Sequence, residues 1–234
     1  MQNTHDMRKT EKLQDMRETQ KAQKTIVMLI SGNGTNLQAI IDSITQQRIN
    51  AKISAVIANQ ETAYGLTRAK NSGIPTFFIS HKDFSSREKY DAKMISCIDQ
   101  YSPDLIVLAG FMRILTPAFV THFQGRMLNI HPSLLPKYKG LHTHQRAIDA
   151  GDSEHGVSVH FVTSELDGGP VVLQSKVPIF AQQNAQELEE RVQQQERQMY
   201  PLVIKWFCED RLKMFDNKAL LDNQILAAGG YAVE

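Results

Sequence analysis

Apolar and polar positions alternate in a regular way along most of the chain. Short apolar runs, often β-branched, recur between segments in which an apolar residue returns every three or four positions, and polar turns separate the two kinds. The first pattern is typical of strands covered on both faces, and the second of helices with one apolar face. Five strands are therefore expected, over residues 26–30, 53–58, 75–79, 104–109 and 126–130.

Helices are expected between these strands. Thr35 with Gln38, and Ser85 with Glu88, have the spacing of capping boxes. The Thr116–Pro117 pair is a further start signal, typical of an N-cap followed by proline at the first helical position, and residues 62–71 are expected to form a helix that stops at Gly73. Strands alternating with helices predict an α/β fold with a mostly parallel central sheet and helices on both faces.

The pattern changes in the second half of the chain. Val157, Val159 and Phe161 alternate with other residues, which is the period of a strand with two different faces. A turn at residues 165–170 and a further apolar run at 171–177 predict an antiparallel hairpin. A long helix is expected over residues 184–207, kinked or interrupted at its proline, and residues 219–234 show no pattern that predicts a structure.

Composition and charge narrow the class of protein. The chain has 234 residues, 41% hydrophobic and 22% charged, with a formal net charge of +1. No overall field favours nucleic acid or membranes, and no apolar run has the ~18 residues of a membrane span. Cys97 and Cys208 are expected to be reduced core thiols. Residues 1–24 mix acids and bases without aromatic residues, which predicts a solvated tail or frayed helix before a single domain at 25–234.

The first candidate site is the polar loop at residues 32–36. It lies between an apolar strand and a helix, and ligands of parallel sheets bind at the carboxyl ends of the strands. Backbone N–H groups and the positive end of a helix favour phosphate there. The loop lacks the third glycine of a dinucleotide fingerprint, so it indicates either a monophosphate site or an ordinary turn.

Asn129 and His131 form the second candidate. They lie two residues apart at the end of a strand, so both side chains can point to the same side. An amide donor beside an imidazole suits a developing oxyanion, although both could instead bond loop backbone. Asp167 is a third candidate, but the Gly-Gly-Pro that follows it also explains it as a turn residue.

Three more groups leave two interpretations open. Ser158 and His160 share one strand face, which either lines a polar cavity or is the exposed face of an edge strand. Glu196 falls on the inward stripe of the long helix, where a buried carboxylate needs a partner such as a substrate amine or Arg191. His142 and His144 lack a third metal ligand at suitable spacing, so no metal is expected.

One basic cluster could attract a phosphate or a polyglutamate tail, or simply form a solvated face. Its members are Lys137, Lys139 and Arg146.

Four motifs together resemble those of the glycinamide ribonucleotide formyltransferases of purine synthesis. They are residues 31–38, 108–115, 129–136 and 165–170, and their order and spacing match as well. The resemblance extends from about Ile26 to Tyr231. It implies a Rossmann-like formyltransferase fold, and transfer of the formyl group of 10-formyltetrahydrofolate, as co-substrate, to the amine of 5-phosphoribosylglycinamide.

The resemblance also implies roles for particular residues. Asn129, His131 and Asp167 match the catalytic positions, with the carboxylate favouring the charged form of the imidazole. The positions that match ribonucleotide contacts are Gly34, Thr35, Asn36, Leu37, Gln38 and Glu196. The positions that match folate contacts are Arg87, Met112, Arg113, Ile114, Leu115 and Asn129.

Two rival functions remain at this point. A formyltransferase acting on methionyl-tRNA would carry a further domain, whereas little more than a short tail is expected after the long helix, and the near-neutral charge also disfavours tRNA. A non-catalytic nucleotide-binding module would leave four residues unexplained together, namely Asn129, His131, Asp167 and Glu196. The expectation is a cytoplasmic enzyme with small-molecule partners, monomeric or weakly dimeric.

Overall fold

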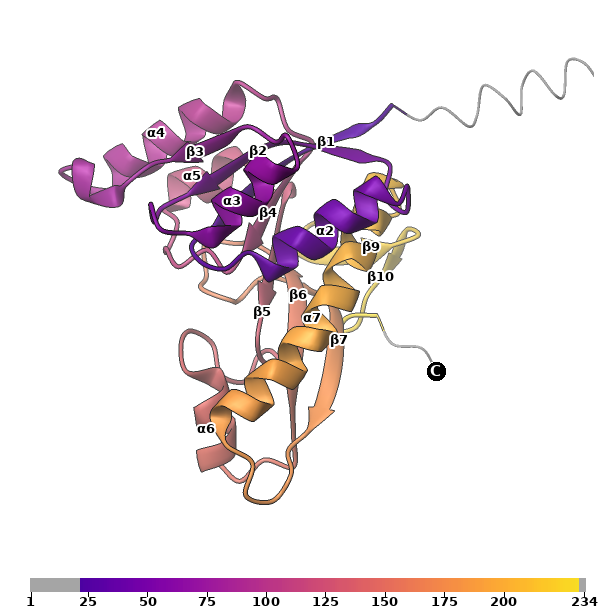
Figure 1. The fold of residues 1–234 in the computed structure, drawn as a ribbon. Helices are drawn as coiled ribbons and strands as arrows, with labels where there is room; N and C mark the ends of the chain where they lie inside the picture. The colour runs from indigo at the N-terminus through magenta and orange to yellow at the C-terminus, as the bar shows by residue number, and fades with distance from the viewer. Residues whose placement is uncertain (1–21, 232–234) are drawn as a thin grey trace, which may run out of the picture.

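A seven-stranded sheet forms the centre of the computed structural model, which describes residues 22–231 (Figure 1). The strand order is β3-β2-β1-β4-β5-β6-β7. The strands from β3 to β5 run parallel, whereas β6 is antiparallel to β5 and β7 to β6. This confirms the mostly parallel sheet and the antiparallel hairpin. The bounds are β1 Lys24–Ile30, β2 Ala51–Ala58, β3 Thr76–Phe78, β4 Leu105–Ala109, β5 Met127–His131, β6 Glu154–Phe161 and β7 Val171–Pro178.

Helices cover both faces of this sheet, as expected. Along β1, Ile26, Met28 and Ile30 pack with α2, α3 and α7 on one face, while Val27 and Leu29 pack with α4 and α5 on the other. Each such side chain contributes about 1.5–3 kcal/mol when fully buried. The bounds are α2 Thr35–Thr45, α3 Tyr64–Asn71, the short 3-10 helix η1 His81–Asp83, α4 Arg87–Asp99, α5 Pro117–His122, α6 Thr143–Asp149 and α7 Ala185–Cys208.

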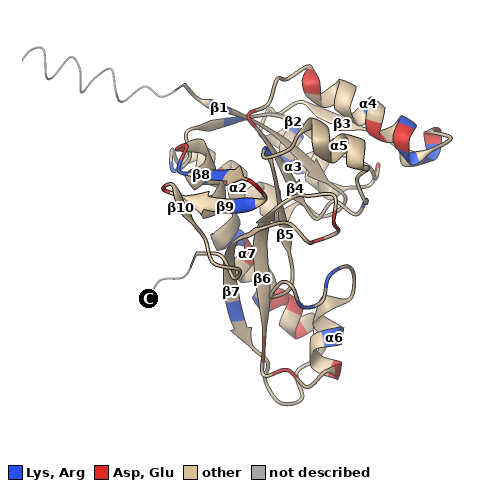
Figure 2. Cartoon of the chain, turned by 180° about the vertical axis from the view of Figure 1, so that it is seen from behind, with Lys and Arg blue, Asp and Glu red and all other residues tan. Residues whose placement is uncertain are grey.

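Charged residues lie outside this core. Figure 2 shows α4 carrying acids and bases together, while the strands at the centre of the sheet are almost free of them. Among the described residues, no helix is both long and apolar enough to cross a bilayer. Residues 1–21 of the expected N-terminal tail lie outside the described residues. The first strand, β1, begins at Lys24, one residue before the expected start of the domain.

Two helix starts differ from the predicted capping boxes. Gly34 precedes α2 in a left-handed conformation, so Thr35 is the first helical residue and cannot cap, while the Gln38 amide donates to Asp42 instead. The hydroxyl of Ser86, one residue after the predicted Ser85, caps α4 by accepting the Lys89 N–H. Both predictions were wrong because the chain enters each helix at a residue that the spacing alone does not select.

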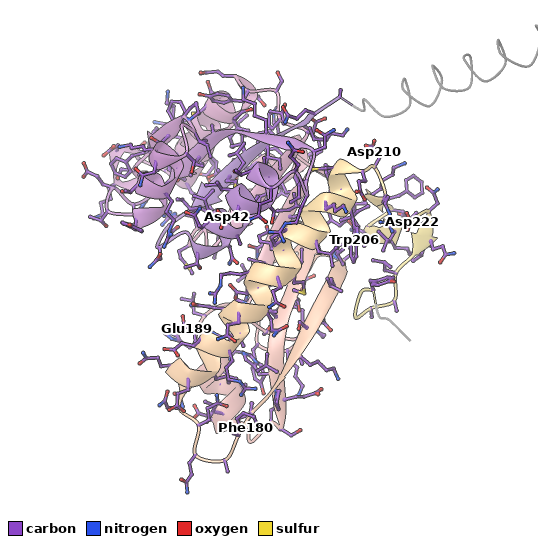
Figure 3. The ribbon with its side chains drawn as sticks, turned by 45° about the vertical axis from the view of Figure 1, so that its right-hand side comes forward. Asp42, Phe180, Glu189, Trp206, Asp210 and Asp222 are labelled. Carbon is purple, nitrogen blue, oxygen red and sulfur yellow. The ribbon has the colours of Figure 1, made fainter. Side chains whose placement is uncertain are left out.

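The long helix α7 is one continuous helix (Figure 3), and Pro201 lies inside it, so no interruption occurs at this proline. A capping box starts this helix, since the Asn184 and Glu187 side chains each accept the other residue's backbone N–H. A proline inside a helix costs about 3 kcal/mol. The residues around it, including Met199 and Val203, are buried against the sheet, and this burial outweighs the penalty.

The prediction of only a short tail after α7 was wrong. A three-stranded antiparallel sheet follows, made of β8 Leu212–Phe215, β9 Lys218–Leu221 and β10 Gln224–Ile225. Beyond it, Tyr231 pairs with Leu173 of β7 and its ring lies 5.4 Å from that of Trp206. The hairpin turns are two Asp-Asn pairs with positive φ, a sequence signal that could have predicted them.

Candidate active site

The loops after β1, β2 and β4 are joined at the carboxyl edge of the sheet. The Ser31 hydroxyl accepts the Met112 N–H at 2.8 Å and donates to the Asn59 side chain at 2.5 Å. The segments predicted to hold the ribonucleotide and the folate are therefore linked through one side chain. Neither Ser31 nor Asn59 was predicted as a site residue, although Asn59 follows a strand directly and the same carboxyl-end rule would have found it.

The loop before α2 has a tightly defined backbone. Gly34 has φ +76°, and a Cβ on it would lie 2.7 Å from the Cα of Gly65 in α3. Arg68 of α3 holds the same loop from outside, donating to the backbone and side-chain oxygens of Asn33 at 2.9 and 2.8 Å. No side chain among residues 22–231 caps α2, so the amides of its first turn remain for a ligand.

Asn36 and Glu196 meet in the interior beside this helix start. The Asn36 amide donates to the Glu196 carboxylate at 2.8 Å, and both residues are buried. Burial raises the pKa of Glu196, while the hydrogen bond from Asn36 opposes that shift. The other predicted partner, Arg191, bonds Pro178 and Gln183 instead. Within residues 22–231, the buried Asn36 Oδ1 has no donor, so this pair offers acceptors to an incoming N–H group.

Asn129, His131 and Asp167 come together at the junction of β5 and β6. Asn129 Nδ2 lies 3.1 Å from His160 Nε2. His131 Nδ1 lies 3.4 Å from Asp167 Oδ2, and His160 Nε2 lies 3.7 Å from Asp167 Oδ1. The two histidines and Asp167 are less than 10% exposed at the side chain. An amide, two imidazoles and a carboxylate thus converge in a water-poor site.

His131 is held between two acceptors. Its Nε2 donates to the backbone oxygen of Tyr138 at 2.9 Å, while Nδ1 faces the Asp167 carboxylate. Asp167 also accepts the Gly140 N–H at 3.0 Å. Since both neighbours of the ring can only accept, the ring satisfies both as a donor only in its doubly protonated form. The geometry therefore suits an acidic imidazolium.

Ser158 of β6 holds the loop that follows His131 through hydrogen bonds to its backbone. The Ser158 hydroxyl accepts the Leu135 N–H at 3.0 Å and donates to the Ser133 oxygen at 2.6 Å, and Gln174 donates to both Ser158 and Leu135. Ser158 and His160 are 0% and 2% exposed, so the interpretation as an exposed edge face was wrong. The strands β5 and β7 cover β6 on both sides.

The segment at residues 110–116 combines exposed apolar side chains with a fixed end. Met112 and Ile114 are 64% and 56% exposed, while the buried Asp91 of α4 accepts the Thr116 N–H at 2.7 Å. Arg113 lies over the ring of Tyr90, at 5.9 Å from its centroid. Such an apolar, backbone-lined segment suits a flat ring with polar edges.

Other predicted residues lie apart from this centre. Arg87 is exposed at the first turn of α4, and no contact among the described residues joins it to Asn129 or His131. The basic cluster is tied within the protein, since Lys137 pairs with Asp152, Lys139 with Glu165, and Arg146 donates to backbone oxygens. Within residues 22–231, no three acidic, histidine or cysteine side chains are grouped to hold a metal ion.

His144 packs against His155 of β6, with ring centroids 5.1 Å apart. Burial lowers the pKa of His144, and burial together with the neighbouring His144 lowers the pKa of His155 to about 4. Unfolded histidine titrates near pH 6.5. Between pH ~6.5 and ~4 the unfolded chain therefore binds protons that the folded chain does not, and the stability present above that window is lost as the pH falls.

The free energy of unfolding, measured with urea, is thus expected to be lower at pH 5 than at pH 7.5. The difference should be smaller in His155→Phe, which fills the same space without titrating. An equal difference in His155→Phe and wild type would contradict the prediction.

The comparisons with known proteins agree with one another. The family model described as "Formyl transferase" matches residues 24–204. The chain is 58% identical to phosphoribosylglycinamide formyltransferase of Escherichia coli over 209 residues, which cover 89% of this chain and 99% of that protein. The identity to the same-named protein of Haemophilus influenzae is 55% over 90% of this chain and all of that protein. The solved phosphoribosylglycinamide formyltransferase of Coxiella burnetii superposes with a TM-score of 0.87 at 51% identity, covering 91% of this chain and all of that one.

Proposed function

Because this chain belongs to the formyl transferase family, we infer that it transfers a formyl group to the amine of 5-phosphoribosylglycinamide in de novo purine biosynthesis. The observation that carries this inference is the grouping of Asn129, His131 and Asp167 at the end of β5, in a chain with these relatives. Such relatives also weigh against the tRNA-formylating and non-catalytic alternatives.

We propose 10-formyltetrahydrofolate as the formyl donor, bound at residues 112–115 and Arg87. The exposed Met112 and Ile114 support this, since their apolar side chains can cover a planar ring while the segment's backbone groups bond its polar edge. Arg113 and Arg87 are cations suited to a carboxylate. Asn129, at the end of the neighbouring strand β5, would contact the formyl group. No metal is required for this chemistry.

The ribonucleotide is proposed to lie against Gly34–Gln38 and Glu196. The first turn of α2 supplies amides for the phosphate, with Thr35, Asn36, Leu37 and Gln38 on that turn. Glu196 and the unpaired Asn36 oxygen then receive the N–H groups of the glycinamide end. This arrangement would bring the substrate amine into the site as an unprotonated nucleophile aimed at the formyl carbon.

Three side chains divide the work of the reaction. As the amine attacks, negative charge develops on the formyl oxygen, and Asn129 donates a hydrogen bond to it. His131 supplies a second N–H when that oxygen takes the place of one of its two present acceptors. Asp167 stabilises the charged imidazole and can pass the amine proton to the leaving nitrogen through water. Holding both substrates together contributes further, within the ~7–11 kcal/mol attributed to proximity.

The remaining assignments follow from the same proposal. Residues 25–234 are proposed to form a single formyltransferase domain, and the enzyme to be a cytoplasmic monomer or weak homodimer with small-molecule partners only. The continuous core on both faces of one sheet supports the single domain.

The decisive test is the rate of folate deformylation by the purified protein with and without 5-phosphoribosylglycinamide. We expect turnover that requires the ribonucleotide and yields its formylated product. Deformylation at the same rate without the ribonucleotide would indicate another acceptor, such as water. No turnover by folded protein would contradict the proposed function.

A further inference from the structure

His160 is a buried histidine that the proposed reaction leaves without a role. It stands opposite Asn129 in the pairing of β5 with β6, and it is 2% exposed. Its two ring nitrogens contact two different groups, the backbone oxygen of Phe161 and the side chain of Asn129. These two contacts determine where its proton lies.

The contact with Phe161 determines the tautomer. His160 Nδ1 lies 2.8 Å from the Phe161 carbonyl oxygen, which can only accept, so Nδ1 carries the proton. In a neutral ring Nε2 then has a free lone pair and must accept. Its neighbour at 3.1 Å is Asn129 Nδ2, a donor. The ring of His160 therefore donates through Nδ1 to the Phe161 carbonyl oxygen and accepts through Nε2 from the amide of Asn129.

We propose that His160 is a positioning residue, whose neutral ring accepts one Nδ2–H of Asn129 and so directs the other Nδ2–H toward the formyl oxygen. The proposal rests on the proposed function. An asparagine amide presents either its nitrogen or its oxygen to a given side, depending on which way round it lies. A carbonyl oxygen facing the developing oxyanion would repel it, so the orientation of this amide matters for catalysis.

The surroundings keep the ring neutral. Burial lowers the pKa of His160 to about 4, and the charges of His131 and Lys139 act in the same direction. The hydrogen bond to the Phe161 oxygen and the charge of Asp167, whose Oδ1 lies 3.7 Å from Nε2, oppose this lowering of the pKa but are outweighed by burial. The other oxygen of Asp167 is occupied by Gly140 N–H and His131. A protonated His160 would direct an N–H at Asn129 and favour the reversed amide.

The tautomer can be measured directly in the full-length wild-type protein. Imidazole ¹⁵N shifts from long-range ¹H–¹⁵N NMR should show His160 protonated at Nδ1 and bare at Nε2 from pH 6 to 8. A charged ring or the Nε2–H tautomer in this range would overturn the proposal. This reading is independent of turnover, so it separates failure of the proposal from failure of the proposed function.

Two substitutions of His160 test its two ring nitrogens separately, because one keeps the acceptor at the position of Nε2 and the other keeps the donor at the position of Nδ1. In His160→Gln, the side-chain oxygen can reach the place of Nε2 and accept from Asn129. In His160→Asn, the shorter amide can still donate to Phe161 but does not reach Asn129. We expect kcat to fall about 10- to 100-fold in His160→Asn, with KM for both substrates nearly unchanged, and to recover to within about 5-fold of wild type in His160→Gln. Equal losses in the two variants would overturn the proposal.

A double-mutant cycle guards against a merely structural effect. If His160 acts through Asn129, His160→Asn should cost little further activity in an Asn129→Ala background. If His160 had only a structural role, His160→Asn would lower kcat by the same factor in the Asn129→Ala background as in the wild type. Such additivity would contradict the proposal. Folding of each variant is checked by its thermal unfolding midpoint.

Discussion

Replacement of His131 by alanine is expected to lower kcat by about 100-fold or more, because the variant loses an acidic N–H at the formyl oxygen. The ring lies between Tyr138 O and Asp167, so it does not hold the ribonucleotide loop at α2 or the apolar segment after β4. The KM for either substrate should therefore change little.

Steady-state kinetics with both substrates varied will measure this effect. Replacement of the exposed His122 by alanine is the matched control, because it removes an imidazole from α5 on the surface and should retain full activity. A His131→Ala enzyme that keeps its kcat and shows a raised KM would assign this residue to binding instead. Asn129→Ala should also lower kcat, and the two losses need not add, since the groups act on one oxygen.

Replacement of Gly34 by alanine is expected to raise the KM for the ribonucleotide strongly and to destabilise the protein. The new Cβ would lie 2.7 Å from the Cα of Gly65, a backbone atom that cannot move aside cheaply. The left-handed φ of +76° adds about 1–2 kcal/mol of strain for any residue with a Cβ. To relieve the close contact with Gly65 and the backbone strain, the start of α2 must shift away from α3. This shift displaces the amides proposed to bind phosphate.

Gly73 provides a control that isolates the clash. It has φ +69°, but a Cβ there would meet nothing within 4 Å, so Gly73→Ala keeps the strain without the close approach. We expect Gly73→Ala to lower the unfolding free energy by about 1–2 kcal/mol with unchanged kinetics. Gly34→Ala should lose more stability and raise the ribonucleotide KM by at least about 10-fold, as expected for the loss of 1.4 kcal/mol of binding. Equal stability and kinetics in the two variants would contradict the role of the Gly34–Gly65 contact.

Local patterns were sufficient to predict the layers of this fold. The apolar runs at β1, β2, β4 and β5 are typical of strands covered on both faces, and the helices between them favour a parallel sheet. The loop after β1 was predicted to carry function because ligands bind at the carboxyl ends of parallel strands. Four motifs then indicated the formyl transferase family, which the comparisons confirm.

The sequence by itself thus determined the fold class, the family and the residues that merit a catalytic hypothesis, since each depends on local periodicity or on motifs read in order. Tertiary structure alone decided which groups become partners. Asn36 bonds Glu196 across 160 residues, and His160 faces Asn129 across 31. Partners this distant depend on strand register and helix packing, which local periodicity does not encode.

The same reason explains the wrong predictions. The cap of α2 depends on the approach of Gly65 to Gly34, and the continuity of α7 through Pro201 depends on burial against the sheet. The small C-terminal sheet packs on the core through Leu212, Ala219 and Leu221, and its Asp-Asn turns are a local signal that the prediction overlooked. At the start of α2 and at Pro201 the free energy of packing between distant segments exceeds the local preference, and only the folded chain brings those segments together.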